Sequence, residues 1–328
     1  MRVIFKAISA ALIAFIFLFV AEFTLDVSAF GAGKSEFLYL ILGLDDAASN
    51  SDSILIVSYN SSDNTSSVIQ LPRDTYCKSK SPIEKINSVY AYNKASGLSD
   101  KAALQKTADF ISQKLGLRFD GYLAVRLSDL VKLVDALGGV KINLPHDVVF
   151  YDKQGKCLRS FKLGENLLSG KDAAFFVRYR AGYANGDLGR LDAQKIFMNA
   201  LFETALHDTG IDELFDIAKV FSDTAVTNIK VREILGMVLK HSSKFRDTQI
   251  TYLTMPGKPV SDKNGIWYYV LNKKATASAL EKHAFSDGKS FDKNEDFLNK
   301  ENQDFSEIYF SEDIKWKEYH SLDGKQLE

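Results

Sequence analysis

Acidic side chains lie where two apolar runs of the sequence approach each other. Asp45 and Asp46 follow the run 37–44, and Asp52 precedes the β-branched run 53–59. If these runs form neighbouring strands, Asp45 and Asp52 meet at one edge of a sheet, where open α/β sheets bind ligands. Two carboxylates there suit Mg²⁺, or Mn²⁺ in its place, together with phosphate oxygens. The alternative is a capped turn, because Asp and Ser are also common turn residues.

A basic residue follows the next apolar run, which covers residues 67–71. Arg73 and Asp74 come directly after Pro72, whose ring restricts the backbone. A planar guanidinium held in this way can donate two parallel hydrogen bonds to a phosphate group. The alternative is an ordinary surface ion pair.

The segment 176–194 holds a denser set of charged and polar side chains. Its members are Arg178, Arg180, Asp187, Arg190 and Gln194. Arg178 and Arg180 share one face only if the backbone is extended. Arg190 and Gln194 share one face of a predicted helix because they lie four residues apart.

Apolar residues continue the helix face on which Arg190 and Gln194 lie. Phe197 and Leu201 follow at helical spacing, so this face runs from a cationic end to an apolar end. Such a face suits a ligand with an anionic head group and a long hydrocarbon tail. The alternative is a solvated charge run beside an ordinary amphipathic helix.

Several familiar catalytic motifs are absent from the sequence. There is no phosphate-binding Gly-rich loop, no Gly-x-Ser-x-Gly elbow and no His-Glu-x-x-His pair. The 5 histidines have no metal-ligand spacing, so any metal would be a hard cation on carboxylates. A net charge of -1 without a basic stripe argues against nucleic-acid binding.

Alternating strands and helices must position these side chains. We predict strands at 37–44, 53–59, 67–71, 122–125, 140–144, 250–255 and 267–271, and helices at 101–115, 127–137, 191–206, 211–221, 231–240 and 276–283. The turn-rich residues 60–64 join the second and third strands into a hairpin. The pattern predicts an α/β fold, with a mixed central β-sheet flanked by helices. From residue 286 the chain is polar, which predicts a loosely ordered tail.

The N-terminus has the composition of a targeting segment. Arg2 and Lys6 precede the apolar stretch 7–21, and Glu22 follows it. With positive charge before the stretch and acid after it, the N-terminus is expected inside the cell. A cleaved signal peptide ending near residue 29 and an uncleaved anchor are both compatible with this pattern, and a buried core helix is disfavoured by the terminal position. We expect an uncleaved single-pass anchor, of about the minimum length for a span, and an extracytoplasmic body.

Two cysteines, Cys77 and Cys157, would also lie outside the cell. In an exported protein such a pair can form a disulfide, although two separate thiols are equally compatible with the sequence. Their spacing does not match a zinc site.

Taken in order, the motifs of this chain resemble those of the LytR–CpsA–Psr family over residues 37–285. The matching stretches are Gly43-Leu44-Asp45, Ser51-Asp52-Ser53, Leu71-Pro72-Arg73-Asp74-Thr75-Tyr76, Lys85-Ile86-Asn87, Val134-Asp135-Ala136-Leu137-Gly138-Gly139-Val140, Leu168-Ser169-Gly170-Lys171-Asp172-Ala173, Val177-Arg178-Tyr179-Arg180 and Gly186-Asp187-Leu188-Gly189-Arg190 with Gln194. Each stretch alone is a weak signal, whereas the ordered series is specific.

The resemblance implies a membrane-anchored enzyme that acts outside the cell. Such enzymes take a glycopolymer from a polyprenyl-pyrophosphate lipid carrier and attach it to a peptidoglycan hydroxyl through a phosphodiester. The polymer can be teichoic acid, capsule or another polysaccharide. The prenyl chain would lie in an apolar tunnel, with the pyrophosphate held by arginines near Mg²⁺. The implied organisation is an anchor with stub and linker (1–33), a catalytic domain (34–285) and a tail (286–328).

The resemblance also assigns roles to individual residues. Asp45 and Asp52 would hold the metal. The pyrophosphate would be bound by Arg73, Lys85, Arg178, Arg180, Arg190 and Gln194. Arg73, Asp74 and Asp187 are the implied catalytic residues, with the two aspartates as base or supporting groups.

Two positions depart from the family pattern. Ala47 and Ala193 stand where arginines are frequent in the family. They favour one alternative to the transferase, a lipid-binding or regulatory protein that keeps the fold but has lost turnover. A second alternative is a pyrophosphatase, which would use the same site with water as the acceptor.

Overall fold

A computed structural model describes most of the region between residues 35 and 320. The described residues are 35–45, 50–144, 146–152, 154–177, 196–201, 203–204, 225–229, 248–286, 291, 297–300, 303–312, 314 and 318–320. Within these ranges no helix is long and apolar enough to cross a membrane. The predicted anchor at 7–21 lies outside the described residues.

The described residues form a central sheet of seven strands in the order β15-β10-β3-β2-β1-β4-β9. Its strands are β1 (Glu36–Leu44), β2 (Ser51–Asn60), β3 (Thr65–Leu71), β4 (Gly121–Arg126), β9 (Val226–Thr227), β10 (Gln249–Thr254) and β15 (Glu318–His320). The β1–β2 and β2–β3 pairs are antiparallel, whereas β4 joins β1 and β10 joins β3 in parallel. The predicted mixed α/β sheet is therefore confirmed.

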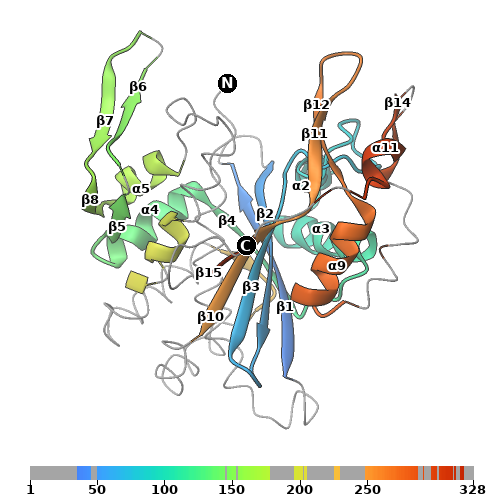
Figure 1. The fold of residues 1–328 in the computed structure, drawn as a ribbon, viewed down its shortest axis with the longest axis horizontal. Helices are drawn as coiled ribbons and strands as arrows, with labels where there is room; N and C mark the ends of the chain where they lie inside the picture. Colours follow the sequence, from blue (N-terminus) through green and yellow to red (C-terminus); the bar gives the residue numbers. More distant parts are fainter. Residues whose placement is uncertain are drawn as a thin grey trace.

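Helices cover both faces of this sheet (Figure 1). One side holds α2 (Ser88–Ala95), α3 (Asp100–Leu115) and α9 (Lys273–His283), and the other holds α4 (Leu127–Ala136) and α5 (Gly170–Phe176). Alternate residues of β1 consequently enter two cores. Leu40 packs with the α3 side and Ile41 with the α4 side, each fully buried. This two-sided burial explains why β1 and β2 are continuously apolar.

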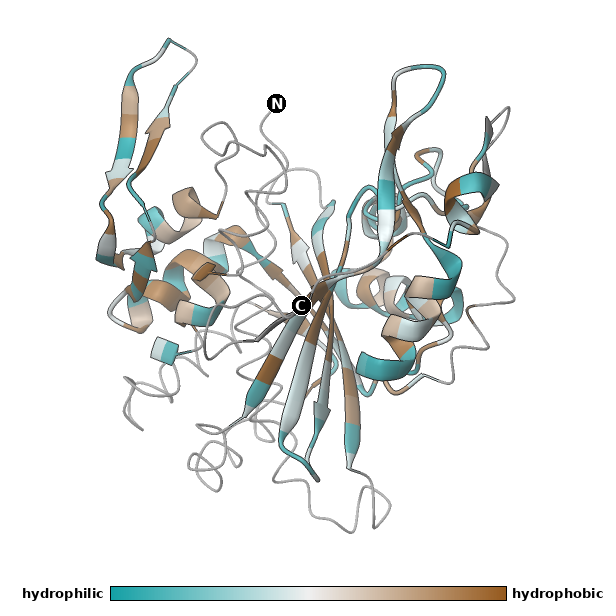
Figure 2. Ribbon diagram, viewed as in Figure 1, coloured by the Kyte–Doolittle hydropathy of each residue, from teal (hydrophilic) through white to brown (hydrophobic). Residues whose placement is uncertain are grey.

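Small hairpins extend from this body. They pair β5 (Val140–Leu144) with β8 (Gly164–Leu168), β6 (Val148–Tyr151) with β7 (Cys157–Phe161), β11 (Gly257–Ser261) with β12 (Trp267–Leu271), and β13 (Asn299–Lys300) with β14 (Gln303–Asp304). The β6–β7 and β11–β12 tips project on either side of the sheet, and Figure 2 shows that both tips are hydrophilic.

The two cysteines are not joined by a disulfide. Cys77 is buried, whereas Cys157 is exposed at the start of β7. The structure therefore agrees with separate thiols, the second of the two possibilities left by the sequence.

The predicted strand and helix bounds agree with the structure to within a few residues, with some differences. Asp52 lies inside β2 rather than before it. The sequence reading missed α2, whose short apolar face is buried. Of the predicted helix at 191–206, residues 196–201 and 203–204 are helical, whereas 211–221 and 231–240 lie outside the described residues.

Several described residues after 286 are packed against the body of the protein. Phe291, Phe297, Phe305 and Tyr309 are buried there, and α11 (Ser306–Tyr309) packs near β12. Strand β15 joins the edge of the central sheet beside β10. These described parts of the segment are held by a few aromatic side chains among many polar residues.

Candidate active site at one edge of the sheet

The site residues meet where β1, β3 and β4 end and β2 begins. Leu44 pairs with Ser51 of β2 and with Arg126 of β4, and Ile54 pairs with Leu71 at the end of β3. A register shift between Gly43 and Leu44 accommodates Asp52 near this end of the hairpin. Asp45, Asp52 and Arg73 therefore lie at the same edge, as the sequence predicted.

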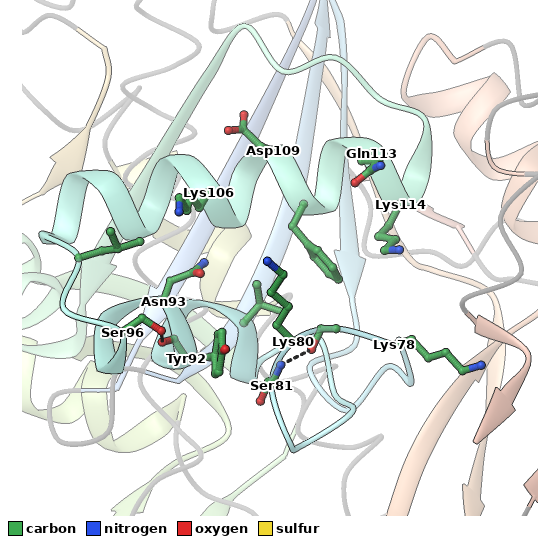
Figure 3. Close-up of a pocket in the computed structure, with 14 residues that line it drawn as sticks. Lys78, Lys80, Ser81, Tyr92, Asn93, Ser96, Lys106, Asp109, Gln113 and Lys114 are labelled. Atoms are coloured by element: carbon green, nitrogen blue, oxygen red, sulfur yellow. Dashed lines mark hydrogen bonds between the residues drawn. The ribbon is translucent and has the colours of Figure 1, made fainter. Parts of the chain in front are cut away.

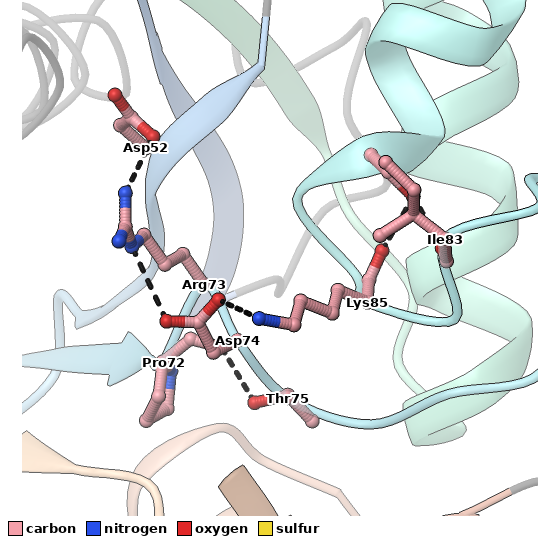
Figure 4. Close-up of polar contacts among 8 residues, drawn as sticks. Asp52, Pro72, Arg73, Asp74, Thr75, Ile83 and Lys85 are labelled. Atoms are coloured by element: carbon pink, nitrogen blue, oxygen red, sulfur yellow. Dashed lines mark hydrogen bonds and ion pairs between the residues drawn. The ribbon is translucent and has the colours of Figure 1, made fainter. Parts of the chain in front are cut away.

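Four charged side chains form a row of alternating sign across this edge (Figure 4). Arg73 Nη1 donates to Asp52 Oδ1 at 3.0 Å, and Arg73 Nε lies 3.5 Å from Asp74 Oδ2. Lys85 Nζ donates to the other Asp74 oxygen at 2.8 Å. The Asp52 side chain is 2% exposed and that of Asp74 is 34% exposed, so Asp74 is the carboxylate of the row that solvent reaches.

Backbone hydrogen bonds hold the loop that carries this row. Pro72 O accepts from both Thr75 N and Thr75 Oγ1, at 3.0 and 2.6 Å, which closes a tight turn around Arg73. Asn87 N donates to Arg73 O at 3.2 Å, and Asn87 O accepts from Ser51 N at 3.0 Å. The Lys85-Ile86-Asn87 stretch thus ties the Arg73 loop to the start of β2.

An aromatic cluster packs against the loop that carries Arg73. Tyr76 packs edge-on against Tyr268 and Phe305, with ring centroids 5.6 and 4.9 Å apart. Lys85 Nζ lies 5.3 Å from the Tyr268 ring centroid, so a cation–π contact adds to its ion pair with Asp74. Phe305 belongs to the C-terminal segment, which the sequence reading had not connected with the site.

Strand β12 is hydrogen-bonded to the same loop. Tyr269 N donates to Asp74 O at 2.8 Å, and Tyr76 N donates to Tyr269 O at 2.9 Å. The Tyr269 hydroxyl donates to Met255 O at 2.9 Å, and burial raises the pKa of this phenol, which keeps it protonated. The Asp74 backbone is therefore fixed by an element nearly two hundred residues later in the chain.

Asp45 lies in the interior at this edge, with 0% of its surface exposed. Its carbonyl oxygen accepts a hydrogen bond from Arg126 Nη1 at 3.1 Å. The sequence reading missed Arg126. This residue directly follows the strand predicted at 122–125, much as Arg73 follows the strand predicted at 67–71. A basic residue at the carboxyl end of a strand was the signal that could have identified it.

The donor set is suited to a hard divalent cation. Asp45 and Asp52 supply carboxylate oxygens, and Mg²⁺ typically takes one or two carboxylates and completes its shell with water and phosphate oxygens. Within the described part of the chain, no group of three or more His, Cys, Asp or Glu side chains could hold a metal alone.

The rest of the predicted anion-binding set lies outside the described residues. These positions are Arg178, Arg180, Asp187, Arg190 and Gln194, together with Ala47 and Ala193. Phe197 and Leu201 are described, and both are fully buried in the α4-side core. The apolar end of the predicted helix face is therefore packed inside the protein.

Comparisons with known proteins give one consistent result. Residues 22–284 match the model of the LytR_cpsA_psr family. The chain is 27% identical over 247 residues to Bacillus subtilis TagU, a polyisoprenyl-teichoic acid–peptidoglycan teichoic acid transferase, covering 74% of this chain and 75% of TagU. It is 26% identical to the transferase TagV of the same organism, covering 76% and 65% of the two chains. The crystal structure of TagV superposes with a TM-score of 0.61 at 24% identity, covering 79% of this chain and 98% of that one.

Proposed function

Because the chain belongs to the LytR–CpsA–Psr family, we propose that it transfers a glycopolymer from a polyprenyl-pyrophosphate carrier to a peptidoglycan hydroxyl, forming a phosphodiester. The similarity to TagU and TagV, which are named for teichoic acid transfer to peptidoglycan, supports this class of reaction. The observation that carries the proposal is the row Asp52–Arg73–Asp74–Lys85 at the ligand-binding edge of the sheet.

The charge of this row explains why further cationic groups are needed. Its two acids balance its two bases, so the row has no surplus positive charge for a pyrophosphate. Phosphoryl transfer depends mainly on positioning and charge neutralisation. We assign that neutralisation to Arg178, Arg180 and Arg190, to Gln194 as a hydrogen-bond donor, and to a bound Mg²⁺ or Mn²⁺.

Within the row, the guanidinium of Arg73 is the group best placed to contact a phosphate. Its Nη1 and Nε atoms face Asp52 and Asp74, and further N–H groups of the same plane remain for a ligand. The metal, held by Asp45 and Asp52, would neutralise charge on the phosphate oxygens. Arg73 and Lys85 orient the Asp74 carboxylate, whose partial exposure suits contact with the acceptor hydroxyl, and Asp187 is the second candidate for that role.

The proposed reaction also sets the location of the protein. A polyprenyl carrier lies in the membrane and peptidoglycan lies outside the cell, so the catalytic domain would be extracytoplasmic. The basic and apolar N-terminal residues 2–21 would supply the single-pass anchor.

Ala47 and Ala193 favour a binding protein without turnover, and a pyrophosphatase that uses the same site with water as the acceptor is the second alternative. Incubating the full chain with a polyprenyl-pyrophosphate-linked oligosaccharide, Mg²⁺ and peptidoglycan fragments separates the three functions. Mass spectrometry of a phosphodiester-linked product would support the transferase. Release of a glycan phosphate without attachment would indicate hydrolysis, and binding with neither product would overturn both enzymatic functions.

A further inference from the structure

A groove of about 720 Å³ lies between α2, α3 and the loop 78–81 (Figure 3). Four lysines line it, Lys78, Lys80, Lys106 and Lys114, against a single carboxylate, that of Asp109. We call it the lysine groove. Its lining carries a surplus of positive charge, whereas the whole chain has a net charge of -1.

Three of the four lysines lack a carboxylate partner among the described residues. Lys78, Lys80 and Lys106 form no ion pair with any described residue. Figure 3 shows Lys80 directed between α2 and α3. Asp109 accepts a hydrogen bond from Gln105 at 2.9 Å. The positive charges along the groove would attract a polyanion.

Aromatic and amide groups lie among the lysines. Tyr92 and Asn93 line the groove from α2, and Phe110 and Gln113 line it from α3. Lys114 Nζ lies 5.3 Å from the Phe110 ring centroid, so the ring presents an apolar surface beside a cation. Apolar ring faces, amide groups and ammonium groups together fit sugar rings that carry phosphate or carboxylate substituents.

One loop connects the lysine groove with the candidate active site. Cys77 N donates to Glu84 O at 3.3 Å, and Tyr76 forms a β-bridge with Lys85, so residues 76–85 turn back on themselves. The loop begins and ends at the site, where Lys85 contacts Asp74, and its outer residues 78–81 line the groove.

The same loop is held against α2. Ser88 Oγ donates to both Ile83 O and Lys85 O at 2.7 Å, and Ser81 is buried. Residues 76–85, which link the lysine groove to the active site, are therefore held in place by hydrogen bonds to α2.

We propose that the lysine groove binds an anionic glycan whose reacting end lies in the active site. The ligand class is an oligosaccharide with phosphate or carboxylate groups along its length. It could belong to the glycopolymer being transferred or to the peptidoglycan acceptor. The inference rests on the proposed function for its biological context, but binding to the groove requires no turnover.

The test uses the folded full chain and labelled glycans without a pyrophosphate, measured by fluorescence anisotropy. The probes are a glycerol-phosphate oligomer, a peptidoglycan fragment with free carboxylates, and a neutral oligosaccharide of similar length. We expect salt-sensitive binding of at least one anionic probe and much weaker binding of the neutral one. The probe that binds more tightly identifies the source of the natural ligand.

The variant Lys80→Gln/Lys106→Gln should weaken anionic binding roughly five- to thirty-fold. Lys101→Gln/Lys274→Gln is the matched control, because it removes the same charge from exposed positions outside the groove. Thermal melts check that both variants fold. Equal affinities in the two double variants, or equal affinity for the neutral probe, would overturn the proposal.

Failure of the proposed function can be recognised separately. Arg73→Lys should retain glycan affinity, because Arg73 does not line the groove, but it should lower transfer. Groove-dependent binding without transfer by the unmodified protein would reject the transferase and leave the glycan site intact.

Discussion

Arg73 contacts Asp52 through Nη1 and Asp74 through Nε, so one guanidinium bridges two carboxylates. A lysine retains the charge but has a single nitrogen, which cannot hold both contacts and also face a phosphate. We predict that Arg73→Lys lowers the transfer rate about ten- to hundred-fold, the loss of one charge-assisted hydrogen bond in the transition state. The measurement is single-turnover transfer at saturating Mg²⁺.

Arg159→Lys is the matched control for this change. Arg159 lies 3.1 Å from Asp172, half-exposed and away from the sheet edge, so transfer should stay within about two-fold of wild type. The same substitution at Arg178 or Arg180 should act as it does at Arg73 if those residues bind the pyrophosphate. Near-wild-type rates at all three positions would contradict the arginine assignment.

The metal assignment can be tested at Asp45. Asp45→Asn should raise the Mg²⁺ concentration for half-maximal transfer by about ten-fold or more, because a neutral amide replaces a ligand carboxylate. EDTA should abolish transfer, and Mg²⁺ or Mn²⁺ should restore it. Asp63→Asn, an exposed change at the opposite turn of the β2–β3 hairpin, should leave the metal titration unchanged.

At the scale of elements, Asp100 joins α2 to α3, the two helices that form the lysine groove. Its Oδ1 accepts from the Tyr90 hydroxyl at 2.9 Å and pairs with Lys94 at 3.1 Å. Burial alone would raise the pKa of Asp100, but the hydrogen bonds from Lys94 and Tyr90 and the nearby charges outweigh it and lower the pKa below its usual value. The folded state therefore favours the ionised carboxylate.

We predict that Asp100→Asn removes a pH-dependent part of the stability. With a folded pKa below the unfolded one, the Asp100 contribution is present above about pH 4 and disappears as the pH falls through the folded pKa. The side chain is 43% exposed, so the contribution should not exceed about 1 kcal/mol. Melting curves from pH 3 to 7 should show a wild-type advantage only at the higher values. A constant difference at every pH would point to packing instead of charge.

At the scale of the whole molecule, the C-terminal segment supports the active site through Phe305, which packs against Tyr76 and is 2% exposed. Phe305→Ala should cost about 3–5 kcal/mol and lower the melting temperature clearly, because it leaves a cavity under the Arg73 loop. Phe310→Ala, in the same segment but 56% exposed, should have a much smaller effect. Similar melting temperatures for the two variants would contradict the supporting role of the segment.

The anchor prediction also concerns the whole molecule. We expect the full-length protein in the membrane fraction with residues 1–29 still attached, because a basic start and an apolar stretch favour retention with the N-terminus inside. Fractionation and N-terminal sequencing provide the measurement. Soluble protein beginning near residue 30 would show that the segment is a cleaved signal peptide.

The sequence alone determined the fold class and one edge of the site. Uninterrupted apolar runs are typical of strands covered on both faces, and β1 and β2 are such strands. Charged residues at the ends of those runs could be placed at one sheet edge because a hairpin fixes the pairing of its strands. The common position of Asp45 and Asp52 followed from local chain geometry, whereas the family resemblance placed Arg73 with them.

Only the tertiary structure decided which side chains meet and what supports them. Three contacts join elements that no local sequence pattern places together. They are the ion pair of Lys85 with Asp74, the hydrogen bond from Arg126 to the Asp45 carbonyl, and the packing of Phe305 against Tyr76. Strand β10 joins β3 in parallel from far along the chain, and such crossovers depend on how the intervening helices pack. The sequence also did not predict that aromatic residues after 286 are buried. Their burial depends on the protein surfaces against which they pack, not on the polarity of their neighbours in sequence.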